Sequence, residues 1–106
     1  MKKIKNIHPG EILCEEFLKP RNITAYQLSK ETDISQTRIS EIIRGKRGIS
    51  TDTALRLSKY FGNSPQFWLG LQADYDVEEQ SKTIVKELDR IQSYSSISKK
   101  KLEHAH

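Results

Sequence analysis

The stretch TAYQLSKETDISQTRISEIIRGKR, residues 24–47, decides how this chain folds. It predicts a short helix, a turn and a second short helix. Thr24 and Ser35 each place a hydroxyl where it can accept from the free N–H groups of a helix start. Gly45 follows the second helix and is suited to ending it, because glycine tolerates the left-handed conformation that helix ends often adopt.

The second helix of this stretch is amphipathic when its residues are placed at about 100° per residue. Its aliphatic side chains share one face, which we expect to bury against the first helix: Ile39, Ile42 and Ile43. The opposite side carries polar and basic groups on a cylinder that fits the major groove of B-DNA. We expect the following residues to face DNA bases: Gln36, Thr37, Arg38, Ser40, Glu41 and Arg44. For Arg38 and Arg44 two roles stay open, because an arginine can either read guanine or hold a phosphate.

Phosphate contacts are expected at the ends of the two helices, where N–H groups and basic side chains are available. The candidates are Thr24, Ser35, Lys46 and Arg47. The net charge of +4 also favours a polyanionic partner. The alternative is an ordinary helical hairpin with a solvated polar face. The turn length, the tripeptide Arg44-Gly45-Lys46 and the surrounding helical segments favour a double-stranded DNA partner instead.

Composition limits the other functional classes. A chain of 106 residues suits one small domain, and its only cysteine, Cys14, excludes an internal disulfide and a cysteine-based zinc site. His8 and Cys14 lack partners at catalytic spacing, so we expect neither an enzyme nor a cofactor or metal. No apolar run is long enough for a membrane span and no signal peptide is evident, so a cytoplasmic protein without a membrane partner is expected.

The whole chain is expected to be all-α: a five-helix, phage-repressor-like helix-turn-helix domain plus a C-terminal helix. The domain should occupy residues 7–75, with the motif at 24–43, and the C-terminal helix residues 76–93. The basic lead at 1–6 and the serine- and lysine-rich tail at 94–106 are expected to be disordered. Residues 102–106 partly resemble an expression tag.

The remaining helices are placed by caps, prolines and apolar spacing. His8-Pro9-Gly10-Glu11 should open the first helix and Pro20 should end it. A fourth helix at 51–61 should bury the following residues: Ala54, Leu55, Leu57, Ser58 and Phe61. Ser64-Pro65 should open a fifth helix at 66–73, and Asp76 with Glu79 should cap the start of the last helix.

The fifth helix carries more large apolar side chains than one face of a short helix can bury in its own domain. Either the C-terminal helix folds over this surface or a second copy of the chain covers it, and we expect a homodimer with a contribution from both. The predicted dimer or partner interface consists of Phe67, Trp68, Leu71, Ile84, Leu88 and Ile91. The sequence does not separate a dimer contact from a contact with another protein.

Residues 24–43 resemble the helix-turn-helix of the phage-repressor (Cro/C1, or Xre) group. The matching positions are Leu28, Ser29, Asp33 and Ile39. Ser29 stands where that group usually has alanine, and Asp33 stands where glycine is usual. Aspartate is among the few residues that tolerate a left-handed turn.

Two flanking phrases narrow the resemblance. His8-Pro9-Gly10-Glu11 near the start and Phe67-Trp68-Leu69-Gly70-Leu71-Gln72, followed by Tyr75-Asp76, are similar to the HigA family of antitoxins. The resemblance implies a homodimer that represses its own operon and binds a HigB-like toxin, a RelE-like mRNA endonuclease. Two alternatives stay open: a stand-alone phage-type repressor, and a toxin-binding protein whose helix-turn-helix is only a scaffold.

Overall fold

The computed structural model describes residues 5–103. Within that range all regular secondary structure is helical and there is no strand, which confirms the all-α expectation. The elements are α1 (Pro9–Ile12), η1 (Leu13–Leu18), α2 (Ala25–Thr32), α3 (Gln36–Ile43), α4 (Thr51–Phe61), α5 (Pro65–Thr83), α6 (Val85–Asp89) and α7 (Tyr94–Glu103). Here η1 is a π-helical continuation of α1.

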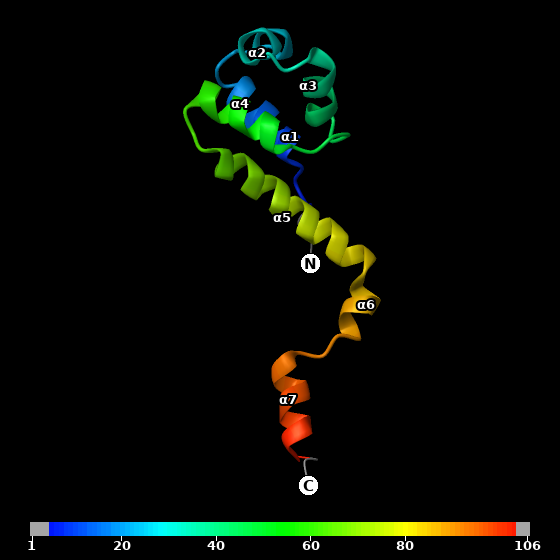
Figure 1. Cartoon of the computed structure of the whole chain (residues 1–106). Helices are drawn as coiled ribbons and strands as arrows, with labels where there is room; N and C mark the ends of the chain where they lie inside the picture. The colour runs from blue at the N-terminus through cyan, green and yellow to red at the C-terminus, as the bar shows by residue number, and fades with distance from the viewer. Residues whose placement is uncertain (1–4, 104–106) are drawn as a thin grey trace.

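The molecule is elongated, with extents of 70 × 32 × 21 Å. Figure 1 shows α1 to α4 gathered at one end together with the first half of α5. The second half of α5 leaves this group, and α6 and α7 continue away from it. None of the described helices is long and apolar enough to cross a membrane.

Serine and threonine hydroxyls begin the main helices as the sequence predicts. The hydroxyls of Thr24, Ser35, Ser50 and Ser64 each accept a hydrogen bond from the backbone N–H three residues later. Each such cap is worth about 1 kcal/mol because it satisfies a donor that has no partner within the helix. Gly62 ends α4 in the left-handed conformation, with φ of 79°.

The core lies among α1, η1, α2, α3, α4 and the first half of α5. Its buried apolar residues are Leu13, Leu18, Leu28, Ile34, Ile39, Ile42, Ile49, Ala54, Leu57 and Trp68. Trp68 was predicted to lie at an interface, and this is wrong, because its side chain is fully buried in the domain. Its indole Nε1 donates to Asn63 Oδ1 at 2.9 Å, and its ring packs on Phe17.

Leu55 was predicted to be buried on α4 and is 53% exposed. The buried residues of α4 are Thr53, Ala54, Leu57 and Ser58. Leu55 follows Ala54 directly, so it is turned about 100° away from the buried stripe.

The predicted break between residues 73 and 76 is absent, because α5 runs without interruption from Pro65 to Thr83. Asp76 does not cap a new helix. Its carboxylate accepts from Gln72 Nε2 at 2.8 Å, one turn earlier in the same helix. The chain bends instead at Ile84, where φ of −115° and ψ of 25° depart from helical values.

Both chain ends differ from the predicted disorder where they are described. Asn6 Nδ2 donates to Tyr75 O at 3.1 Å and to Glu79 Oε2 at 2.9 Å, which ties the lead to α5. Residues 94–103 form α7, whose start is capped by Ser93 Oγ accepting from Ser96 N. Residues 1–4 and 104–106 lie outside the described range.

Candidate nucleic-acid interface

The hairpin of α2 and α3 is held by buried aliphatic side chains. Leu28 of α2, Ile34 of the turn, and Ile39 and Ile42 of α3 are each at most 1% exposed. Ile43 is half-buried beside this cluster. The inward orientation predicted for Ile39 and Ile42 is therefore confirmed, and it leaves the polar side of α3 facing outward.

The turn between α2 and α3 is fixed by local hydrogen bonds. Asp33 adopts the left-handed conformation, with φ of 59° and ψ of 32°. Ser29 Oγ donates to Ile34 O at 2.5 Å, and Thr32 Oγ1 donates to Leu28 O at 2.6 Å. Both departures from the phage-repressor pattern, at Ser29 and Asp33, are thus compatible with a tight turn.

The residues predicted to face bases separate into two groups. The exposed group is Gln36, Thr37, Ser40 and Arg44. The half-buried group is Arg38 and Glu41, whose side chains are 35% and 28% exposed and are held by ion pairs. The outward side of α3 is therefore a row of exposed polar residues. Two charged residues flank this row, and each is held by an ion pair: Arg38 by Asp52 and Glu41 by Arg47.

Glu41 pairs with Arg47, one of the predicted phosphate-binding residues. Arg47 Nη2 donates to Glu41 Oε2 at 3.4 Å across the end of α3. Lys46 lies beside it and is exposed. Thr24 and Ser35 are the caps of α2 and α3, so their hydroxyls lie at helix starts, where anions are favoured.

Arg38 belongs to a network that the sequence analysis missed. Its Nη1 donates to Asp52 Oδ2 at 2.9 Å, and Arg56 Nε donates to both oxygens of the same carboxylate, at 3.2 and 3.0 Å. Arg56 Nη1 also donates to Thr32 O at 3.1 Å. Hydrogen bonds from Arg56 and then Arg38 lower the pKa of Asp52. The one part of this network that the sequence could have indicated is the pair Asp52 and Arg56, because residues four apart are neighbours on a helix.

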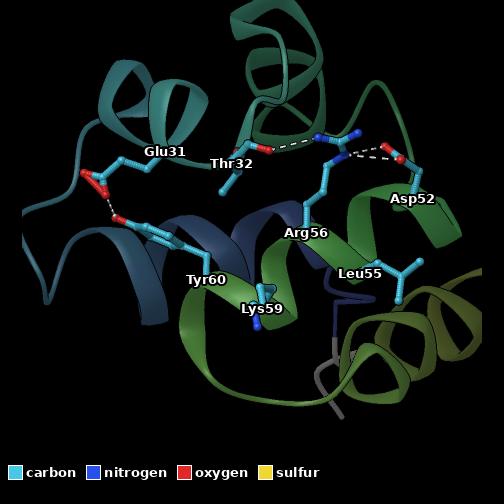
Figure 2. Close-up of a pocket in the computed structure, with 7 residues that line it drawn as sticks. All are labelled: Glu31, Thr32, Asp52, Leu55, Arg56, Lys59 and Tyr60. Carbon is cyan, nitrogen blue, oxygen red and sulfur yellow. Dashed lines mark hydrogen bonds and ion pairs between the residues drawn. The ribbon is translucent and has the colours of Figure 1, made fainter.

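The network borders a groove between α2 and α4 (Figure 2). The lining residues are Glu31, Thr32, Asp52, Leu55, Arg56, Lys59 and Tyr60. At the opposite end from Asp52, Tyr60 Oη donates to Glu31 Oε2 at 2.7 Å. Hydrogen bonds from Tyr60 and then from Gln27 lower the pKa of Glu31.

The first segment of the chain packs against the end of α3, which the sequence analysis also missed. A Cβ on Gly10 would lie 1.7 Å from Ile42 O, so only glycine fits there. His8 Nδ1 accepts from Gly10 N at 2.9 Å, and the His8 ring lies edge-on to Tyr75 with centroids 4.9 Å apart. Burial lowers the pKa of His8, with a smaller opposing effect from Asp76.

The loop after α3 is fixed by α5. Gln72 Oε1 accepts from Ile49 N at 2.7 Å, and the amide of Gln72 also limits the space around Gly48. The basic residues Lys46 and Arg47 therefore lie on a loop whose exit is bound to α5. We did not predict a role for Gln72 from the sequence.

The predicted interface residues other than Trp68 are exposed or half-buried. Phe67 is 38%, Leu88 43% and Ile91 69% exposed, while Leu71 and Ile84 are half-buried. Two further apolar residues are exposed nearby: Val77 of α5 is 65% exposed and Val85 of α6 is 51% exposed. The apolar stripe, defined here as Val77, Ile84, Val85, Leu88 and Ile91, thus lies beyond the core on the extended part of the chain.

The capped hairpin and the outward polar row of α3 define a helix-turn-helix protein of the phage-repressor class. Comparison with known proteins agrees, because the family model described as helix-turn-helix matches residues 15–68. Virulence-associated protein I of Dichelobacter nodosus is 54% identical over 78 residues, which cover 72% of this chain and 72% of that protein.

Solved structures narrow the class. One similar structure is that of the Pseudomonas aeruginosa antitoxin HigA with the higBA promoter. Its sequence is 37% identical and the TM-score is 0.81, and the match covers 85% of this chain and 99% of the HigA chain. A HigA-family addiction module antidote protein from Coxiella burnetii is 42% identical with a TM-score of 0.80, covering 86% and 100%. The chain belongs to the helix-turn-helix family that contains the HigA antitoxins.

Proposed function

We propose that this protein is a homodimeric, sequence-specific DNA-binding repressor of its own operon and the antitoxin of a toxin–antitoxin pair. The observation that carries the proposal is the polar row of α3, held outward by the burial of Ile39 and Ile42. The promoter named with the Pseudomonas HigA structure supports the same assignment, since that chain is matched over almost its full length.

The residues on the outward side of α3, some exposed and Glu41 half-buried, have the chemistry to distinguish base pairs. Gln36 can form paired hydrogen bonds with adenine, Glu41 can accept from cytosine N4, and the Thr37 methyl can contact a thymine methyl. Arg44 is exposed and suits guanine. Ser40 lies in the same row, between Thr37 and Arg44.

We assign the positioning of the protein on the duplex to residues at the ends of α2 and α3. The proposed phosphate contacts are Thr24, Ser35, Lys46 and Arg47. These contacts carry no sequence information but supply much of the affinity and its dependence on salt. Replacing Lys46 with alanine should weaken binding to all duplexes alike and reduce the salt slope by about 1.

Dimerisation is assigned to the apolar stripe, which runs from Val77 in α5 to Ile91 just after α6. Several large apolar side chains on one extended segment favour burial against another protein surface. A two-fold dimer would bury the same surface from each copy and would present two α3 helices to two half-sites. Phe67 and Leu71, exposed or half-buried near the start of α5, would extend this interface.

The toxin partner is proposed to be a RelE-like mRNA endonuclease encoded next to this gene. The antitoxin and antidote names of the two solved relatives support it. Co-expression should restore growth to cells that express the neighbouring small basic protein. Growth arrest despite soluble co-expression of both proteins would contradict the antitoxin assignment and leave the repressor assignment standing.

A mobility shift with the DNA upstream of the gene tests the repressor assignment. We expect the shifted band to survive a large excess of scrambled duplex and to disappear with unlabelled upstream duplex, because specific sites bind about 10³-fold or more tightly than random DNA. Equal competition by both duplexes would favour the scaffold alternative, in which the motif only supports toxin binding.

A further inference from the structure

Asp52 is the central acceptor of a three-residue bridge at the edge of α3. It lies in the first turn of α4 and accepts from Arg38 of α3 at 2.9 Å. It also accepts two bonds from Arg56, whose Nη1 reaches Thr32 O at 3.1 Å and Asp33 O at 3.4 Å (Figure 2 shows Asp52, Arg56 and Thr32). One carboxylate thereby links α3 and α4 to the turn of the motif.

The bridge restrains the Arg38 side chain in two ways. The contact engages Nη1, so the guanidinium is held in one orientation while Nε and Nη2 stay available to an external acceptor. The adjacent carboxylate also offsets the positive charge of Arg38. An arginine without such a neighbour would be free to pair with any nearby phosphate, a contact that every duplex offers.

Arg56 does not need Asp52 to hold the turn. Its bonds to the Thr32 and Asp33 carbonyls are made by Nη1, whereas its bonds to Asp52 are made by Nε. Loss of the carboxylate charge therefore weakens the restraint on Arg38 and leaves the donors that support the turn. This separation distinguishes a role in recognition from a role in folding.

We propose that Asp52 is a positioning residue that determines DNA specificity by orienting Arg38 towards the base edges and withholding it from non-specific phosphate contacts. The inference rests on the proposed DNA-binding function and adds a residue outside the helix-turn-helix itself. Asp52 itself makes no contact with DNA in this role and acts through Arg38.

The test compares Asp52→Asn with Glu31→Gln, measuring affinity for operator and for scrambled duplex across a salt series. Both changes remove one carboxylate charge from the same groove, but Glu31 bonds to Tyr60 and Gln27 and not to Arg38. For Asp52→Asn we expect the ratio of specific to non-specific affinity to fall about tenfold and the salt slope on scrambled DNA to steepen by about 0.9. For Glu31→Gln we expect neither change.

The same pair of measurements in an Arg38→Gln background decides whether Asp52 acts through Arg38. We expect Asp52→Asn to change neither the ratio nor the slope in that background. An equal effect in both backgrounds would show that Asp52 acts through its own charge, which would overturn the proposal. Thermal unfolding of each variant identifies any loss of folding.

Failure of this inference is distinct from failure of the proposed function. If the wild-type protein shows no preference for its upstream DNA, the repressor assignment fails. If the wild type is selective and Asp52→Asn keeps its full selectivity, only the role of Asp52 is overturned.

Discussion

At the scale of single residues, His8 packs the first segment of the chain against Tyr75 of α5. Its Nδ1 accepts from Gly10 N, which requires the neutral ring, and burial lowers its pKa below the ordinary value of 6.5. The folded protein therefore binds this proton less readily than the unfolded chain does. The stability that His8 contributes is present above pH 6.5 and is lost as the pH falls through the lowered pKa.

Urea unfolding between pH 7 and pH 5 tests this assignment. We expect the unfolding free energy of the wild type to fall over this range and that of His8→Asn to fall less, because asparagine can cap a helix without titrating. Carboxylates whose pKa values are lowered, such as Asp52 and Glu79, affect stability at still lower pH. Equal slopes for both proteins would contradict the role of His8.

Two helical glycines allow a matched test of close packing, because an added methyl group would be crowded at Gly10 and unhindered at Gly70. Gly10→Ala should destabilise the fold by about 1–3 kcal/mol, because the new methyl group would collide with the backbone of Ile42. Gly70→Ala should stabilise it by about 0.5–1 kcal/mol, because nothing lies within 4 Å of that Cβ and alanine favours the helix. Chemical denaturation measures both, and a neutral Gly10→Ala would refute the proposed close contact.

At the scale of elements, caps and apolar spacing were sufficient to predict α2, α3 and α4 from the sequence. Their signals are local, since each cap acts within three residues of itself. The extent of α5 was not predicted correctly, because Asp76 with Glu79 has the spacing of a cap whether or not the chain stays helical. The fully buried position of Trp68 was also missed, because it depends on η1 and α4 packing around it.

Of the candidate site, the sequence predicted only the features that depend on residues close together in the chain. The exposed row of α3 follows from the burial of Ile39 and Ile42 within the same helix. The bond between Arg38 and Asp52 joins residues 14 apart, and the bond between Gln72 and Ile49 joins residues 23 apart. Such contacts leave no periodic pattern in the sequence, so they could not be predicted from a single chain.

The start of α3 offers a test at this scale. Ser35→Ala should lower the unfolding free energy by about 1 kcal/mol, because Ser35 Oγ accepts from Arg38 N at 3.1 Å. Ser40→Ala, on the exposed side of the same helix, should leave stability within about 0.5 kcal/mol of wild type. A similar loss in both variants would argue against a specific cap at Ser35.

At the scale of the whole molecule, the extended α5–α6 segment is expected to be buried in a homodimer. Leu88→Glu places a charge in the apolar stripe and should produce monomers in light scattering at concentrations where the wild type is dimeric. Gln92→Glu adds the same charge at an exposed position outside the stripe and should remain dimeric. A monomeric wild type, or a dimeric Leu88→Glu, would contradict this interface.

The most direct test of the central claim is the affinity of wild type and Gln36→Ala for a complete set of single-base variants of the upstream operator. If α3 reads the bases, Gln36→Ala should lose about 1–3 kcal/mol of discrimination at one position of each half-site and keep the wild-type preferences elsewhere. A uniform loss of affinity at every position, with an unchanged base preference, would show that the outward row of α3 does not read sequence.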